Sequence, residues 1–129
     1  MAARILVVED NEANLQLVQY LLACAGHEVL LARDGIEGVV MTLAERPDLV
    51  VCDLQMPRLD GYGMLRALRA DALTKSIPVI AVTAFSMPDD RVRVACAGFD
   101  GYLSKPIEPE TFVAQVEAFL SDGVPPLAG

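Results

Sequence analysis

The chain has 129 residues, of which 53% are hydrophobic and 22% charged, which is typical of one folded domain with its own core. Its formal net charge of −8 argues against a nucleic-acid surface, which requires a basic face. No stretch reaches the roughly 18 to 20 apolar residues of a membrane helix, and the start, MAARILVVEDNE, is too acidic for a signal peptide.

Short apolar runs alternate along the chain with longer segments of helical periodicity. In the first of these segments Leu15, Val18, Leu22 and Ala25 share one helical stripe, while Asn11 can cap its start and Gly26 its end. Continuously apolar strands separated by helices predict a five-stranded parallel sheet covered on both faces, a three-layer α/β/α domain. The predicted strands are 4–8, 28–32, 48–53, 77–84 and 101–105, and the predicted helices are 11–26, 35–46, 62–70, 88–98 and 108–120.

The ends of the chain and its cysteines bear on its organisation. We expect one domain over residues 1–122 and a short proline-containing tail at 123–129, and, because no output domain follows, a stand-alone protein. Cys24, Cys52 and Cys96 are odd in number, widely spaced and in apolar surroundings. They are expected to be small buried side chains in a reducing compartment, which indicates the cytoplasm.

Chemically active side chains follow the predicted strands at the points where they end. Glu9 and Asp10 follow the first strand, Asp53 ends the third, Thr83 ends the fourth and Lys105 ends the fifth. In an open parallel sheet the carboxyl ends of the strands lie at one edge, where functional groups gather. We therefore expect these five side chains to lie close together.

Three converging carboxylates repel one another unless a cation neutralises them. Oxygen ligands without histidine or thiolate select a hard ion such as Mg²⁺, which favours sites that phosphate oxygens complete. A lysine and a threonine on neighbouring strands suit the surroundings of a phosphoryl group. Asp53 is then the candidate nucleophile, because a carboxylate can form an acyl phosphate.

Each of these residues also has an ordinary structural explanation. Glu9 and Asp10 can be charges at a helix N-terminus, and Asp53 can be a turn-forming acid. Thr83 can be a common strand residue and Lys105 a surface charge. Their shared position at strand ends, where about one strand residue in five or six falls, and their complementary charges favour the functional interpretation.

Four segments resemble a known family: ILVVEDNEANL, DLVVCDLQMPRLDG, PVIAVTA and YLSKP, in this order. They are similar to the receiver domain of bacterial two-component response regulators, over about residues 4–120. The resemblance implies a CheY-like, flavodoxin-like sheet with strand order 2-1-3-4-5. It also implies a phosphorylation-controlled switch, whose phosphoryl group comes from a histidine kinase or a histidine phosphotransfer protein. The switch would bind a downstream protein through the last two helices and the fifth strand. Within the family, EDNEANL, Gln55 and VTAFSM look most similar to single-domain cell-cycle regulators.

The resemblance assigns roles to the acidic residues of this sequence. Asp53 matches the phosphoacceptor. Glu9 and Asp10 match the pair of acids that holds Mg²⁺, and the backbone carbonyl of Gln55 matches a further ligand. Glu9 stands where many receivers have aspartate, so its longer side chain would reach the metal directly or through water.

Further roles fall on the fourth and fifth predicted strands. Thr83 and Ala84 match the phosphate-binding segment, in which the threonine hydroxyl closes onto the phosphoryl group, and Lys105 matches the phosphate-pairing lysine. The peptide bond before Pro106 is expected to be cis, which proline permits. Tyr102 matches the aromatic residue that rotates during switching, although a tyrosine in this position is more often part of a core.

Two side chains are expected to control the water that hydrolyses the aspartyl phosphate. Gln55 and Phe85 should flank the approach opposite the leaving oxygen; Phe85 would exclude water, and Gln55 cannot act as a base. We therefore expect a long-lived phosphoprotein. The alternative is that Phe85 is a loop aromatic that caps apolar surface.

Three other functions are alternatives to the signalling switch. A receiver domain excised from a hybrid kinase or a larger response regulator would share this sequence to residue 120. An aspartate-nucleophile, Mg²⁺-dependent phosphatase of the haloacid dehalogenase type needs a second acid where this chain has Gln55, which cannot transfer a proton. A flavodoxin-like cofactor binder needs a phosphate-binding loop after the first strand, but VEDNEAN is anionic and lacks glycine.

Overall fold

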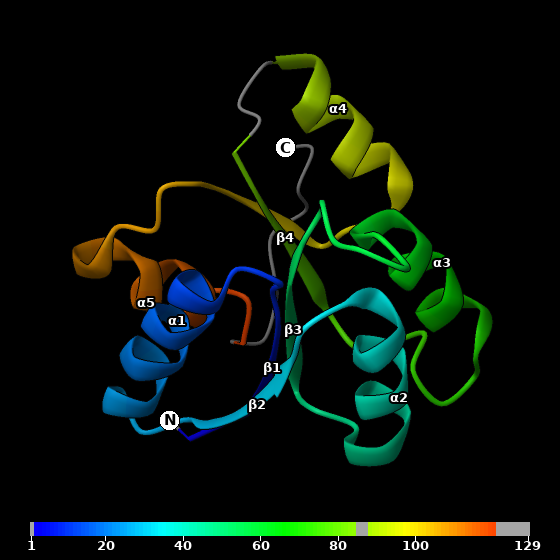
Figure 1. Cartoon of the computed structure of the whole chain (residues 1–129). Helices are drawn as coiled ribbons and strands as arrows, with labels where there is room; N and C mark the ends of the chain where they lie inside the picture. Colours follow the sequence, from blue (N-terminus) through cyan, green and yellow to red (C-terminus); the bar gives the residue numbers. More distant parts are fainter. Residues whose placement is uncertain (1, 85–87, 121–129) are drawn as a thin grey trace.

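The structure is a computed structural model that describes residues 2–84 and 88–120, in which a parallel sheet lies between two layers of helices (Figure 1). The strands are β1 (Arg4–Val8), β2 (Glu28–Ala32), β3 (Leu49–Asp53), β4 (Val79–Thr83) and β5 (Gly101–Ser104). The helices are α1 (Glu12–Cys24), α2 (Gly35–Glu45), α3 (Gly61–Ala70), α4 (Pro88–Ala97) and α5 (Pro109–Glu117). The predicted elements are confirmed, with ends that differ by no more than three residues.

The strand order is β2-β1-β3-β4-β5, as the family resemblance implied, and every neighbouring pair is parallel. The register brings the carboxyl ends of the central strands level with one another. Val8 pairs with Cys52, Asp53 pairs with Val82, and Thr83 pairs with Ser104. The residues at the carboxyl ends of these strands therefore meet at one edge of the sheet.

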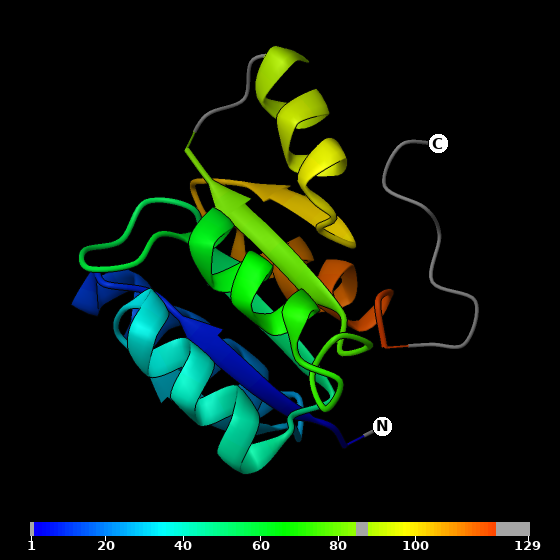
Figure 2. The ribbon, with the colours of Figure 1, turned by 90° about the vertical axis from the view of Figure 1, so that its right-hand side faces the viewer.

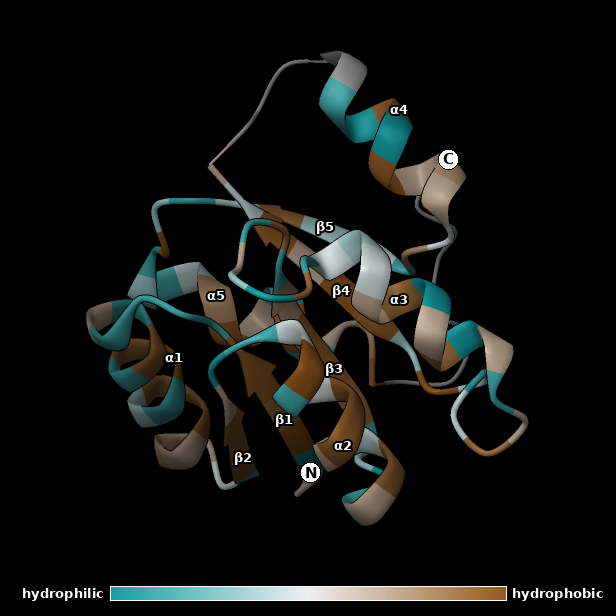
Figure 3. Ribbon diagram, turned by 45° about the vertical axis from the view of Figure 1, so that its right-hand side comes forward, coloured by the Kyte–Doolittle hydropathy of each residue, from teal (hydrophilic) through white to brown (hydrophobic). Residues whose placement is uncertain are grey.

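Successive residues of the central strands enter two separate cores. Ile5 and Val7 of β1 join the core beneath α1 and α5, whereas Leu6 and Val8 join the core beneath α2, α3 and α4. Figure 1 shows the two helical layers on opposite sides of the sheet, Figure 2 shows α2 and α3 in front of it, and Figure 3 shows that the apolar residues concentrate in the strands. This alternation follows from the two-residue period of a strand, and each fully buried large apolar side chain contributes about 1.5–3 kcal/mol.

Three of the helices, α1, α2 and α3, begin at side chains that satisfy one of their first backbone N–H groups. Asn11 accepts a hydrogen bond from the Asn14 N–H, and Asp34 and Asp60 cap α2 and α3 in the same way. The expected stop at Gly26 is confirmed, because this glycine adopts the positive φ of 94° that follows a helix C-terminus. Within the described residues, the helices are too short or too polar to cross a membrane.

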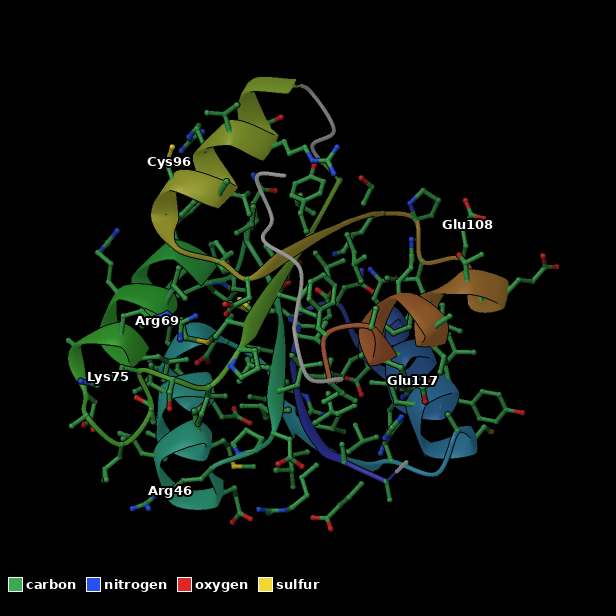
Figure 4. All side chains as sticks on the ribbon, turned by 180° about the vertical axis from the view of Figure 1, so that it is seen from behind. Arg46, Arg69, Lys75, Cys96, Glu108 and Glu117 are labelled. Atoms are coloured by element: carbon green, nitrogen blue, oxygen red, sulfur yellow. The ribbon has the colours of Figure 1, made fainter. Side chains whose placement is uncertain are left out.

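His27 joins three elements at the other end of the sheet. Its side chain is fully buried, its Nδ1 accepts from the Ala3 N–H at 3.1 Å, and its Nε2 lies 2.8 Å from Oε2 of Glu117. Since Nδ1 is the acceptor, Nε2 carries the hydrogen and donates it to the glutamate. Glu117 is the last residue of α5 (Figure 4), so this contact fastens α5 to the start of β1.

Candidate functional site

An open cavity of about 450 Å³ lies at the carboxyl edge of the sheet. It contains seven of the residues that the sequence singled out: Glu9, Asp10, Asp53, Gln55, Thr83, Ala84 and Lys105. The remaining lining residues are Asn11, which caps α1, and Asn14 in the first turn of that helix. The sequence identified Asn11 only as a helix cap and did not mark Asn14, although both lie within four residues of the acidic pair and an amide there can face the same cavity.

Three carboxylates converge in this cavity. Glu9, Asp10 and Asp53 each present an oxygen atom, and these atoms all lie within 4.8 Å of one another. Glu9 and Asp53 are buried, with 6% and 8% of their surface exposed, whereas Asp10 is open to solvent. A set of oxygen donors that is buried on one side and exposed to solvent on the other fits Mg²⁺, because this ion keeps some of its water ligands when it binds to protein.

Lys105 lies between two of the three acids. Its Nζ is 2.9 Å from Oε1 of Glu9 and 3.0 Å from Oδ2 of Asp53. Burial lowers the pKa of the ammonium, but the hydrogen bonds to Glu9 and Asp53 outweigh it, so the pKa of Lys105 is raised overall. One ammonium cannot neutralise three carboxylates, and the cavity therefore keeps a net negative charge.

Burial and the neighbouring acid both act on the pKa of Glu9. Burial, followed by the hydrogen bond with Asp53, raises the pKa of Glu9 from 4.5 to about 7, while Lys105 acts in the opposite direction. The ionised form of Glu9 is therefore costly near neutral pH when no further cation is present. A divalent ion at the three carboxylates would remove this cost, which is a second way in which the residues fit a metal.

Gln55 approaches the acids through its backbone. Its N–H donates to Oδ1 of Asp53 at 3.3 Å, and its side chain is exposed. The loop that carries it is closed at its base, where the Gly61 N–H donates to the carbonyl of Leu54 at 3.0 Å. This turn keeps the backbone after β3 beside the carboxylates.

The remaining predicted residues divide between this cavity and a neighbouring one. Thr83 is 1% exposed at the end of β4, and its carbonyl accepts from the Lys105 N–H at 2.8 Å. The Lys105–Pro106 peptide bond is cis, as expected. Tyr102 and Pro106 line a second cavity, of about 280 Å³, between α4, β5 and α5. Phe85 lies outside the described residues, so its control of water stays a prediction.

The expectation for the cysteines is wrong for two of the three. Cys52 is fully buried beside Asp53, but Cys24 and Cys96 are exposed thiols. Cys96 lies on the outer side of α4 (Figure 4), because the helical period turns it away from the buried Val94. An apolar local sequence does not bury a residue on the outer face of a helix.

Comparison with known proteins agrees with this architecture. The chain belongs to the response regulator receiver domain family, whose sequence model matches residues 5–117. It is a phosphoacceptor domain of two-component signalling with an acidic Mg²⁺-binding pocket, and not a conventional enzyme. Membership of the family implies a histidine kinase as partner.

Individual relatives cover nearly all of the chain. The polar-differentiation response regulator DivK of Brucella anthropi is 37% identical over 122 residues, which cover 95% of this chain and 99% of that protein. The solved structure of the chemotaxis response regulator CheY4 of Vibrio cholerae has a TM-score of 0.85 and 30% identity, and covers 91% of this chain and 98% of its own.

A third relative carries a metal. The receiver domain of a sensor histidine kinase from Pseudomonas aeruginosa has a magnesium ion coordinated in its active-site cleft. It is 32% identical, with a TM-score of 0.82 and complete coverage of both chains. A response regulator and a receiver domain of a sensor kinase thus both match nearly the whole chain.

Proposed function

We propose that Asp53 is the residue that accepts the phosphoryl group. The observation that carries this proposal is the position of its carboxylate, at the end of a buried strand, beside two further acids and within 3.0 Å of the Lys105 ammonium. Burial fixes the orientation of this carboxylate and excludes water from one side of it. The cavity leaves the other side open to a phosphodonor.

The transfer exchanges one bond to phosphorus for another. An Asp53 oxygen bonds to the phosphorus of a phosphohistidine on a histidine kinase or phosphotransfer protein, and the phosphorus–nitrogen bond breaks with its electrons passing to the imidazole. Glu9, Asp10, Asp53 and the Gln55 carbonyl would hold Mg²⁺, which would supply positive charge for the phosphoryl oxygens. The Lys105 ammonium can pair with a second phosphoryl oxygen, because it already contacts Asp53.

A small phosphodonor such as acetyl phosphate tests this assignment without a partner kinase. With Mg²⁺, intact mass spectrometry should show one added phosphoryl group on the parent and none on Asp53→Asn. Asp60→Asn is the matched control, because Asp60 is an exposed acid in the same region and asparagine can still cap α3. Labelling that survives in Asp53→Asn would contradict the assignment.

The output surface is proposed to be the region of α4, β5 and α5. Two features support it: the cavity of about 280 Å³ between these elements, and the backbone bond that joins Thr83 to Lys105 at the end of β5. If the Thr83 hydroxyl moves to a phosphoryl oxygen, the half-buried Tyr102 can turn into the space that it leaves, and the outer surface changes shape. A downstream protein in the cytoplasm would bind the altered surface.

NMR spectra of the phosphorylated protein test this coupling. Amide shifts should change in residues 88–120 as well as around Asp53. Changes confined to 9–12 and 53–57 would contradict a coupled output surface.

A further inference from the structure

Residues 54–60, the loop between β3 and α3, are held against the start of α2 by two contacts. Arg58 donates from Nε to Oδ2 of Asp34 at 2.9 Å, and its Nη2 donates to the same oxygen. The N–H of Gly35 donates to the carbonyl of Leu59 at 3.0 Å. A Cβ at Gly35 would collide with that carbonyl, so the two backbones are in direct contact.

Arg58 adopts a backbone conformation that arginine rarely takes. Its φ is 67°, in the left-handed region, where any residue with a Cβ is strained relative to glycine. The conformation places the guanidinium over Asp34, whose side chain is only 9% exposed. The other oxygen of Asp34 accepts from the Glu37 N–H at 2.8 Å and caps α2. Arg58 is therefore bound to a carboxylate whose position the capping bond fixes.

The other end of this loop lies at the acidic cavity. Its base is closed by the bond from the Gly61 N–H to the Leu54 carbonyl, and a Cβ at Gly61 would lie 2.7 Å from the Asp53 carbonyl. The tip is fastened to α2 through Arg58. Gln55 lies between the two anchors and lines the cavity, so the position of its backbone depends on both.

We infer that Arg58 and Asp34 are positioning residues for the metal: their ion pair holds the 54–60 loop so that the backbone of Gln55 faces the three carboxylates. Neither side chain lines the cavity. The inference rests on the proposed metal site and adds to it the ion pair that fixes the position of the 54–60 loop.

Titration of the parent and its variants with MgCl₂ alone tests the inference. Calorimetry measures the dissociation constant, and the ¹³C shift of the Gln55 carbonyl reports on the ligand itself. Arg58→Gly removes the ion pair and relieves the strained backbone. Asp34→Asn keeps an oxygen for the α2 cap but presents an amide where Arg58 needs an acceptor.

Both variants should bind Mg²⁺ about 3- to 10-fold more weakly, below the 10- to 100-fold typical of groups bonded directly to a ligand. The change in the ¹³C shift of the Gln55 carbonyl on addition of Mg²⁺ should also be smaller in both variants. The double variant should bind no more weakly than either single one, because both remove the same contact. Arg58→Lys, which retains one charged donor, should recover part of the affinity.

Long-range charge predicts a different pattern. Removing the positive charge of Arg58 would strengthen cation binding, whereas removing the negative charge of Asp34 would weaken it. Arg46→Gly is the matched control: Arg46 also has a positive φ, of 46°, but lies at the far end of α2 (Figure 4). It should leave Mg²⁺ affinity unchanged.

Unchanged affinity in both variants, or opposite changes as charge alone predicts, would overturn the inference and leave the metal site standing. A parent protein that takes up no Mg²⁺ would overturn both.

Discussion

Replacing Glu9 by glutamine should stabilise the metal-free protein near pH 8 and change little near pH 4. In the folded protein Glu9 is buried beside Asp53, and its pKa is raised from 4.5 to about 7. An acid whose folded pKa is raised favours the folded state only while it is protonated. Its full contribution is therefore present below pH 4.5 and is lost as the pH rises through about 7.

The size of the effect follows from the pKa and from the openness of the cavity. At 1.36 kcal/mol per pKa unit, the rise corresponds to about 3 kcal/mol for a fully enclosed carboxyl. Solvent reaches the site beside the exposed Asp10 and screens the charge, so about 1–2 kcal/mol is expected. Glutamine has the shape of the protonated acid and should remove this penalty.

Urea unfolding, followed by circular dichroism in EDTA, measures the difference. With a slope of about 1–3 kcal/mol per molar urea, the Glu9→Gln midpoint at pH 8 should lie roughly 0.5–1 M above that of the parent. Saturating Mg²⁺ should reduce the difference, because the ion neutralises the same charge in the parent. Equal midpoints at pH 8 in EDTA, or the same gain at pH 4, would refute the reasoning.

Two further predictions concern backbone contacts that stabilise the fold. His27→Ala leaves the buried Ala3 N–H without its acceptor and should cost about 1–3 kcal/mol in urea unfolding, with faster hydrogen exchange at Ala3. Glu117→Gln should cost less, because the amide oxygen can still accept from His27; an equal loss would contradict the assigned tautomer. Gly61→Ala places a Cβ 2.7 Å from the Asp53 carbonyl and should cost about 1–3 kcal/mol, whereas an unchanged midpoint would mean that the loop shifts freely.

The elements and the identity of the candidate residues could be predicted from sequence because both depend on neighbours in the chain. Two-residue and helical periodicities mark strands and helices over a few residues, and they predict each strand and helix in the part of the chain that the structure describes. Glu9, Asp53 and Thr83 were found because each lies at or just after the end of an apolar run. In a parallel sheet, that position alone assigns them to one edge.

The tertiary structure decided the contacts that join distant segments. Only the register of four strands places the Lys105 ammonium between Glu9 and Asp53, and only folding brings Arg58 onto Asp34, 24 residues away in the chain. The outward positions of Cys24 and Cys96 likewise depend on which helix face meets the sheet. Local periodicity carries no information about such pairings, because side-chain reach, burial and charge balance are set by residues that become neighbours only when the sheet has formed.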